Sequence, residues 1–160
     1  MKKIFLITVC LFMTGCLFAQ TKQQQLTLIV VIDRDISQDL INGKFIIKDK
    51  EGQSIDEMPF REWVGQLEMT SEDFKKLFTF KKEDTLYVTF KYNSYKLDTN
   101  YVYEGKIPKS LVNPRYIILN FYNKKNKESR EMYVFTKNQD YLLQVAGPGY
   151  GTILKTINKE

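Results

Sequence analysis

The sequence contains no histidine, and its only two cysteines, Cys10 and Cys16, lie close to the N-terminus. Without histidine, the chain cannot build a Ser-His-Asp or Cys-His nucleophile pair or a histidine-ligated zinc site. If the N-terminal segment is removed, no thiol remains for a disulfide, a thiolate zinc site or an iron–sulfur cluster. We therefore predict no cofactor, no metal and no catalytic residue, and a fold that is stabilised by its hydrophobic core alone.

The first residues of the chain are typical of a bacterial export signal. Residues 1–3 (MKK) are basic, and residues 4–13 form an apolar run that is too short to span a bilayer comfortably. Such a segment takes no part in the fold of the mature protein. We therefore predict an exported protein that lies in the periplasm, at the outer membrane or outside the cell.

Two processing sites remain open within this segment. Cleavage after Ala19 would give a signal peptide over residues 1–19. Residues 13–16 (MTGC) instead resemble a lipobox, which would give a leader over residues 1–15 and a lipid on Cys16. A lipid anchor on Cys16 is the only membrane contact that we predict.

Positive charge is present in only a small excess. The formal net charge is +5, and loss of Lys2 and Lys3 with the leader would lower it by two, to +3. The lysines are scattered, apart from Lys124, Lys125 and Lys127 in one expected loop. This charge is too small and too dispersed for a nucleic-acid interface, so we expect no nucleic-acid partner.

Residues 84–97 (DTLYVTFKYNSYKL) contain the strongest strand pattern of the chain. Apolar and more polar side chains alternate over residues 86–92, which is typical of a strand with one buried face. Asn93-Ser94 supplies turn residues, and a second strand is expected to start at Tyr95. We interpret the segment as the central hairpin of a β-sandwich.

Runs of β-branched and aromatic residues predict further strands. The run 26–32 (LTLIVVI) is apolar throughout, which is typical of a strand buried on both faces. The expected strands after it are 44–48, 61–69, 101–107, 115–123, 131–136, 141–145 and 152–157. Residues 55–59 are expected to be irregular, and residues 123–128 (NKKNKE) to form a hairpin loop.

Residues 70–78 (TSEDFKKLF) predict the one helix. Thr70 or Ser71 can cap it, and acidic residues precede lysines along it, in the order that suits the helix dipole. No linker rich in Pro, Gly or Ser divides the chain. We therefore predict a single, mostly β domain over residues 26–158, with one short helix and a C-terminal β-meander.

Several short motifs resemble the prealbumin-like β-sandwich. They are Phe45-Ile46-Ile47 with Asp49 and Gly52, Thr70 before Phe74, and Asp84-Thr85-Leu86 with Val88 leading to Tyr95. The most similar version is the carboxypeptidase-regulatory-like domain of exported Bacteroidetes proteins, over residues 26–122. Ser94 stands where that family usually has a glycine, and the family's middle glycine is missing. The resemblance implies a single antiparallel Greek-key β-sandwich with a binding or accessory role, and it brings no catalytic residues.

Trp63 is the only tryptophan of the chain. In the expected strand 61–69 it shares one face with Gly65, Leu67 and Met69, so we interpret it as a core anchor. The alternative is that Trp63 is a platform for a ligand.

Carboxylates gather in two expected loops. Their members are Asp33, Asp35 and Asp39 in one loop, and Asp49, Glu51, Asp56 and Glu57 in the other. Oxygen-rich loops can hold calcium, but neither has the EF-hand spacing. We interpret both as solvated loops, and a carboxylate hydrolase stays a minor alternative.

Tyrosines are the most unusual excess, because all ten lie at residue 87 or later. The candidate binding residues are Tyr87, Tyr116 and Tyr122, joined by Tyr101 or Tyr103. Period-two alternation places them opposite the apolar face. Tyrosine combines a rigid apolar ring with a polar tip, which suits a glycan or peptide surface. The alternative is that these rings pack the sandwich and its rim.

These observations predict a non-catalytic, exported binding or accessory module of the bacterial cell envelope, with a protein or a glycan as partner. The alternative is a structural or assembly subunit of an envelope complex, or a periplasmic immunity-type inhibitor. An exposed, contiguous aromatic patch would favour the first. A long, uncovered edge strand would favour the second, through strand addition.

Overall fold

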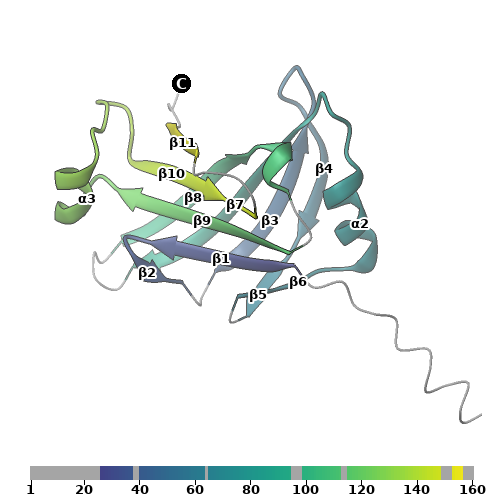
Figure 1. The fold of residues 1–160 in the computed structure, drawn as a ribbon, viewed down its shortest axis with the longest axis horizontal. Helices are drawn as coiled ribbons and strands as arrows, with labels where there is room; N and C mark the ends of the chain where they lie inside the picture. Colours follow the sequence, from purple (N-terminus) through teal and green to yellow (C-terminus); the bar gives the residue numbers. More distant parts are fainter. Residues whose placement is uncertain are drawn as a thin grey trace, which may run out of the picture.

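The computed structural model describes residues 26–37, 40–63, 65–94, 99–112, 115–148 and 153–156. These residues form two β-sheets packed face to face, and the helices α2 and α3 lie at opposite ends of this sandwich (Figure 1). The predicted mostly β fold with two sheets is therefore confirmed. The expected export signal and Cys16 lie outside the described residues.

The larger sheet has seven strands in the order β11-β10-β9-β1-β6-β5, with β2 beside β1. They are β1 (Thr27–Ile32), β2 (Asp35–Ile36), β5 (Arg61–Trp63), β6 (Gln66–Glu68), β9 (Tyr116–Asn123), β10 (Tyr141–Ala146) and β11 (Ile153–Thr156). Strands β9, β10 and β11 are consecutive antiparallel neighbours, as expected for the C-terminal meander.

One pair of strands contradicts the prediction that all strands are antiparallel. β1 and β9 run parallel, with Thr27 opposite Tyr116 and Ile32 opposite Phe121. Parallel neighbours need a long connection between them. Here the connection between β1 and β9 contains the whole smaller sheet and also β2, β5 and β6 of the larger sheet.

The smaller sheet has four strands in the order β4-β3-β7-β8. They are β3 (Ile41–Lys48), β4 (Ser54–Pro59), β7 (Thr85–Ser94) and β8 (Thr99–Ile107). β7 and β8 form a central hairpin, but the predicted turn at Asn93-Ser94 is wrong, because both residues pair with β8 and prolong β7. Tyr95, where the second strand was expected to start, lies outside the described residues. Residues 55–59, expected to be irregular, belong to β4 because pairing with β3 outweighs their weak strand propensity.

The core lies between the two sheets. Its centre contains Leu28 and Val30 of β1, Val88 and Phe90 of β7, and Leu119 and Phe121 of β9, all buried. The Phe90 and Phe121 rings meet edge to face, with their centroids 5.3 Å apart. β1 was expected to be buried on both faces, but its other side chains are only half-buried because they point to the outer face of the larger sheet.

The predicted helix is confirmed as α2 (Ser71–Thr79), whose first turn is capped by Thr70. The Thr70 hydroxyl accepts a hydrogen bond from the Asp73 N–H at 3.1 Å. A second helix, α3 (Lys127–Met132), forms at the end of the loop expected at 123–128. The strand expected at 131–136 is wrong, because its first two residues belong to α3 and residues 133–136 are not in a strand. The side chain of Asn126 caps this helix by accepting from the Ser129 N–H at 3.1 Å. A short 3₁₀ helix, η1 (Lys109–Leu111), follows β8.

Candidate functional site

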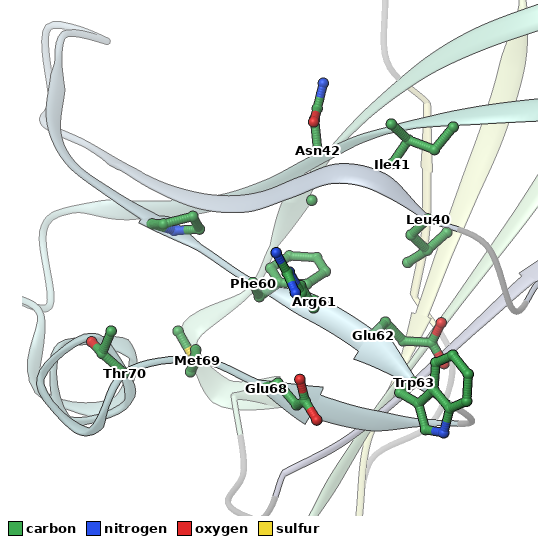
Figure 2. A pocket seen from close by; sticks show the side chains of 12 residues that line it. Leu40, Ile41, Asn42, Phe60, Arg61, Glu62, Trp63, Glu68, Met69 and Thr70 are labelled. Atoms are coloured by element: carbon green, nitrogen blue, oxygen red, sulfur yellow. The ribbon is translucent and has the colours of Figure 1, made fainter.

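A groove of about 920 Å³ lies between the start of β3 and the β5–β6 hairpin (Figure 2). Its apolar wall includes Leu40, Ile41, Phe60, Trp63 and Met69, and its polar side chains include Asn42, Arg61, Glu62 and Glu68. We call it the Trp63 groove. Ile41 and Trp63 are large apolar residues that remain exposed within it, at 41% and 70% of their surface.

The groove forms where the chain crosses from the smaller sheet to the larger one. Phe60 lies between β4 and β5, and its N–H donates to the Gly43 carbonyl at 2.9 Å. A side chain on Gly43 would not fit, because its Cβ would lie 2.5 Å from the Phe60 ring. The close approach of Gly43 therefore allows the Phe60 ring to be buried against Phe45, with a centroid separation of 4.8 Å.

A β-bulge shapes the other side of the groove. The pairing of β3 with β7 shifts between Ile41 and Lys44, and Asn42 within this shift has a φ of 54°. Asparagine tolerates this left-handed conformation better than most residues do. Bulges re-aim neighbouring side chains and are frequent beside functional sites. Ile41 lies at the start of this bulge, and its side chain is exposed in the groove.

Trp63 is not the core anchor that we expected. The predicted strand 61–69 is instead a hairpin, in which Trp63 pairs with Gln66 and Gly65 has a φ of 79°. The turn reverses the chain, so Trp63 and Leu67 point to opposite sides of the sheet, and only Leu67 is buried. The indole of Trp63 therefore extends from the end of β5 at the groove (Figure 2).

Glu62, beside Trp63, is the most unusual polar residue of the groove. It is only 8% exposed, and its Oε1 accepts the Gly65 N–H at 2.6 Å. Its Oε2 has no hydrogen-bond partner among the described residues. A buried acceptor left without a donor costs roughly 1–3 kcal/mol. A ligand that donates a hydrogen bond to Oε2 would remove this cost.

Glu62 was not among the site residues predicted from the sequence, because no local pattern marks it. Phe60 and Glu62 are two residues apart and point to the same side of their segment, where both are buried. A carboxylate two positions from a buried aromatic is therefore a charge on an inward-facing position. That pattern is visible only when the register of the strand is known.

The two sheets separate the tyrosines that were expected on one face. Tyr87 lies on the outer face of the smaller sheet, with the Lys48 ammonium 4.4 Å from its ring centroid. Tyr116 and Tyr122 lie on the outer face of the larger sheet, on the opposite side of the sandwich. Tyr103 is fully buried, and Tyr101 packs against the core. The five residues therefore do not form one surface.

The hydroxyls of two of these tyrosines form hydrogen bonds with other side chains. Tyr103 donates to Asn123 Oδ1 at 2.7 Å, and burial raises the pKa of its phenol well above the usual value. The Tyr122 hydroxyl lies 2.9 Å from Gln144 Oε1, and the Tyr133 ring is 4.5 Å away between centroids. Burial, with a hydrogen bond to Tyr133, raises the pKa of Tyr122 to about 12.

Asp35, Asp56 and Glu57 were expected in loops but lie in the strands β2 and β4. Three carboxylates of the second expected loop have structural roles. Asp49 caps a turn by accepting the Gln53 N–H at 2.7 Å, Asp56 pairs with Lys76 at 3.1 Å, and Glu57 pairs with Lys44 at 2.7 Å. No group of three His, Cys, Asp or Glu residues that could hold a metal ion occurs among the residues described. Asp39 lies outside them.

No helix within the described ranges is long and apolar enough to cross a membrane. Comparisons of the chain with protein-family models, with curated proteins and with solved structures found no match.

Proposed function

We propose that this chain is a non-catalytic binding module of the bacterial cell envelope, and that its protein or glycan partner docks in the Trp63 groove. The observation that carries the proposal is the exposure of Trp63, the only tryptophan, at 70% of its surface within a groove. Tryptophan is among the residues most enriched at binding hot spots, where its ring is covered by the partner. In the folded chain, most of the surface of this ring remains exposed to solvent.

The absence of histidine from the sequence supports a binding role, because it removes the commonest general acid–base residue. Export of the module rests on residues 1–19, with Cys16 as the alternative anchor. The prealbumin-like Greek-key arrangement also belongs to the proposal and rests on the short motifs between residues 45 and 95.

The groove is a better candidate than the tyrosines for the main binding site. Tyr103 is in the core, and Tyr87 lies on the opposite side of the sandwich from Tyr116 and Tyr122. In contrast, the groove brings Ile41, Trp63 and polar side chains together in one concave surface. Concave sites with apolar walls and a few polar groups are typical binding sites.

Strand addition at β8, which would suit an assembly subunit, is less favoured. β8 is an edge strand of the smaller sheet, but the Tyr141 hydroxyl lies against its middle. This hydroxyl accepts the Glu104 N–H at 2.8 Å and donates to the Glu104 carbonyl at 2.9 Å. An incoming strand would have to displace Tyr141 to pair at Glu104.

A comparison of wild type with Trp63→Ala tests the proposal. Both are immobilised and exposed to envelope extracts and to purified cell-wall glycans, with Tyr87→Ala as the control for a half-buried aromatic on the outer face of the other sheet. We expect Trp63→Ala to lose the bound partner while it keeps the thermal stability of the wild type, and Tyr87→Ala to keep the partner. Retention of the partner by Trp63→Ala would contradict the groove as the site.

A further inference from the structure

We infer that the Trp63 groove binds the cationic side chain of a lysine or arginine from a partner protein, with the cation at Glu62 Oε2 and the aliphatic stem against Trp63. This inference rests on the proposed function, because it names the chemistry of the partner in the same groove. It selects a protein partner over a glycan.

The first reason is the unpaired oxygen of Glu62. Neither Glu62 nor Glu68 forms an ion pair within the described part of the chain, and Glu62 Oε2 has no donor there. Buried carboxylates are normally matched by a cation or by several donors. Gly65 supplies a single neutral donor to the other oxygen, Oε1. The charge of Glu62 therefore calls for a cation that the described residues do not supply.

The second reason is the apolar wall beside this carboxylate. Lysine and arginine have long aliphatic stems that lie along apolar surface while the charged end reaches a polar group. In Figure 2, Leu40 and Trp63 lie on either side of Glu62 and Ile41 lies beyond Leu40, and together they provide such a surface. The face of an indole also attracts a cation more strongly than the face of any other aromatic side chain does.

The third reason is the local charge. The charged residues of the groove are Arg61, Glu62 and Glu68, so its formal charge is −1, whereas the whole chain has a formal charge of +5. Arg61 stands opposite Glu68 in the pairing of β5 with β6, and the two formal charges offset each other. Glu62 is then the charge that remains to attract a ligand. A neutral glycan would leave this charge unmatched.

Binding requires a small movement, because Oε2 is fully buried. A cation reaches it only if a side chain that lines the groove moves aside. Trp63 and Glu62 point to opposite sides of β5, but β5 is the edge strand of the larger sheet, so a long side chain that lies against Trp63 can reach the Glu62 side around this edge. The indole fluorescence should therefore change on binding, and Trp63 is the only tryptophan that can report it.

The test uses the mature chain and three probes. A displayed library of random heptapeptides is selected on the wild type, neutral oligosaccharides are screened in parallel, and the best peptide is remade with its basic residue replaced by norleucine.

Affinities are measured from Trp63 fluorescence for the wild type, Glu62→Gln and Glu68→Gln. Glu62→Gln keeps an oxygen for the Gly65 N–H and replaces the charged Oε2 by a neutral NH2 group, which cannot accept from a cation. Glu68→Gln removes a charge of the same sign from the exposed rim. Trp63→Ala, measured by calorimetry, reports whether a ligand uses the groove.

We expect lysine or arginine to dominate one position of the selected peptides. Their affinity should fall about tenfold or more in Glu62→Gln and with norleucine, and less than about threefold in Glu68→Gln. Peptides without a basic position, or peptides that bind Glu62→Gln as well as wild type, would overturn this inference. If those peptides or an oligosaccharide lose affinity in Trp63→Ala, the proposed function stands although this inference has failed. If no ligand loses affinity in Trp63→Ala, this inference and the proposed function both fail.

Discussion

Asp33 accepts hydrogen bonds from both the backbone N–H and the side-chain amide of Asn123, at 2.8 and 2.6 Å. Asp33 and Arg34 form the two-residue turn between β1 and β2, and both have positive φ, at 49° and 73°. The Ser129 hydroxyl of α3 also donates to Asp33, at 3.0 Å. One carboxylate therefore connects a tight turn with the end of β9 and with α3.

We predict that Asp33→Ala lowers the free energy of unfolding by about 3 kcal/mol, because it leaves a buried amide and a hydroxyl without an acceptor. Asp33→Asn tolerates the same φ and keeps one acceptor oxygen, so it should cost less. Urea unfolding measures both variants, with the exposed Glu83→Ala as a control expected to stay within about 0.5 kcal/mol. Equal stability of Asp33→Ala and wild type would contradict a structural role for this network.

We predict that stability falls at alkaline pH, in part through Tyr103. Burial raises the pKa of Tyr103 in the folded state, so the folded protein keeps this proton after the unfolded chain has lost it. The stabilisation is complete below the phenol pKa of the unfolded chain, about 10, and declines above it by up to about 1.4 kcal/mol per pH unit.

Tyr103→Phe isolates that contribution. The variant should lose stability at neutral pH, because Asn123 Oδ1 loses the donor that lies 2.7 Å away. Its stability should also decline less steeply than that of the wild type above about pH 10. Denaturant melts across this pH range compare the two slopes, and parallel slopes would show that Tyr103 titrates alike in both states.

We predict that Gly105→Ala separates the two sheets locally. Its Cβ would lie 2.1 Å from Leu143 Cδ2, across the core between β8 and β10. Overpacking of this kind costs roughly 1–3 kcal/mol. In a double-mutant cycle with Leu143→Ala, the two losses should be clearly less than additive, since the smaller residue makes room. Strict additivity would mean that the two positions do not touch.

We predict that Trp63→Ala changes the free energy of unfolding by less than about 0.5 kcal/mol, because the ring is exposed. The matched variant is Phe60→Ala, which removes a buried aromatic from the same segment and should cost roughly 3–5 kcal/mol. Thermal and urea unfolding of both variants decide the point. A large loss in Trp63→Ala would restore the core-anchor interpretation.

We predict that the mature protein starts near Gln20 or at a lipidated Cys16. Mass spectrometry of the protein from its native envelope distinguishes the two by mass and by acyl chains. An intact Met1 in the mature protein would contradict export. Cys16→Ala should release the protein from the membrane fraction only in the lipidated form.

The sequence by itself determined the features that depend on local chemistry. The alternation over residues 86–92 identified β7, and the cap at Thr70 identified α2, because both patterns act within a few residues of the chain. The mostly β fold and the C-terminal meander follow from the same kind of pattern. α3 was missed because six residues give little periodicity, although Asn126 was a visible cap.

Only the tertiary structure decided which side of each strand faces the other sheet. Strand pairing and the turn at Gly65 turned Trp63 outward and Glu62 inward, and no local pattern determines such a register. The pairing of β7, β8 and β9 within their sheets likewise placed Tyr87 and Tyr116 on the two opposite outer faces of the sandwich and buried Tyr103. The Trp63 groove unites the start of β3 with the β5–β6 hairpin, which belongs to the other sheet, so it exists only once the two sheets have packed.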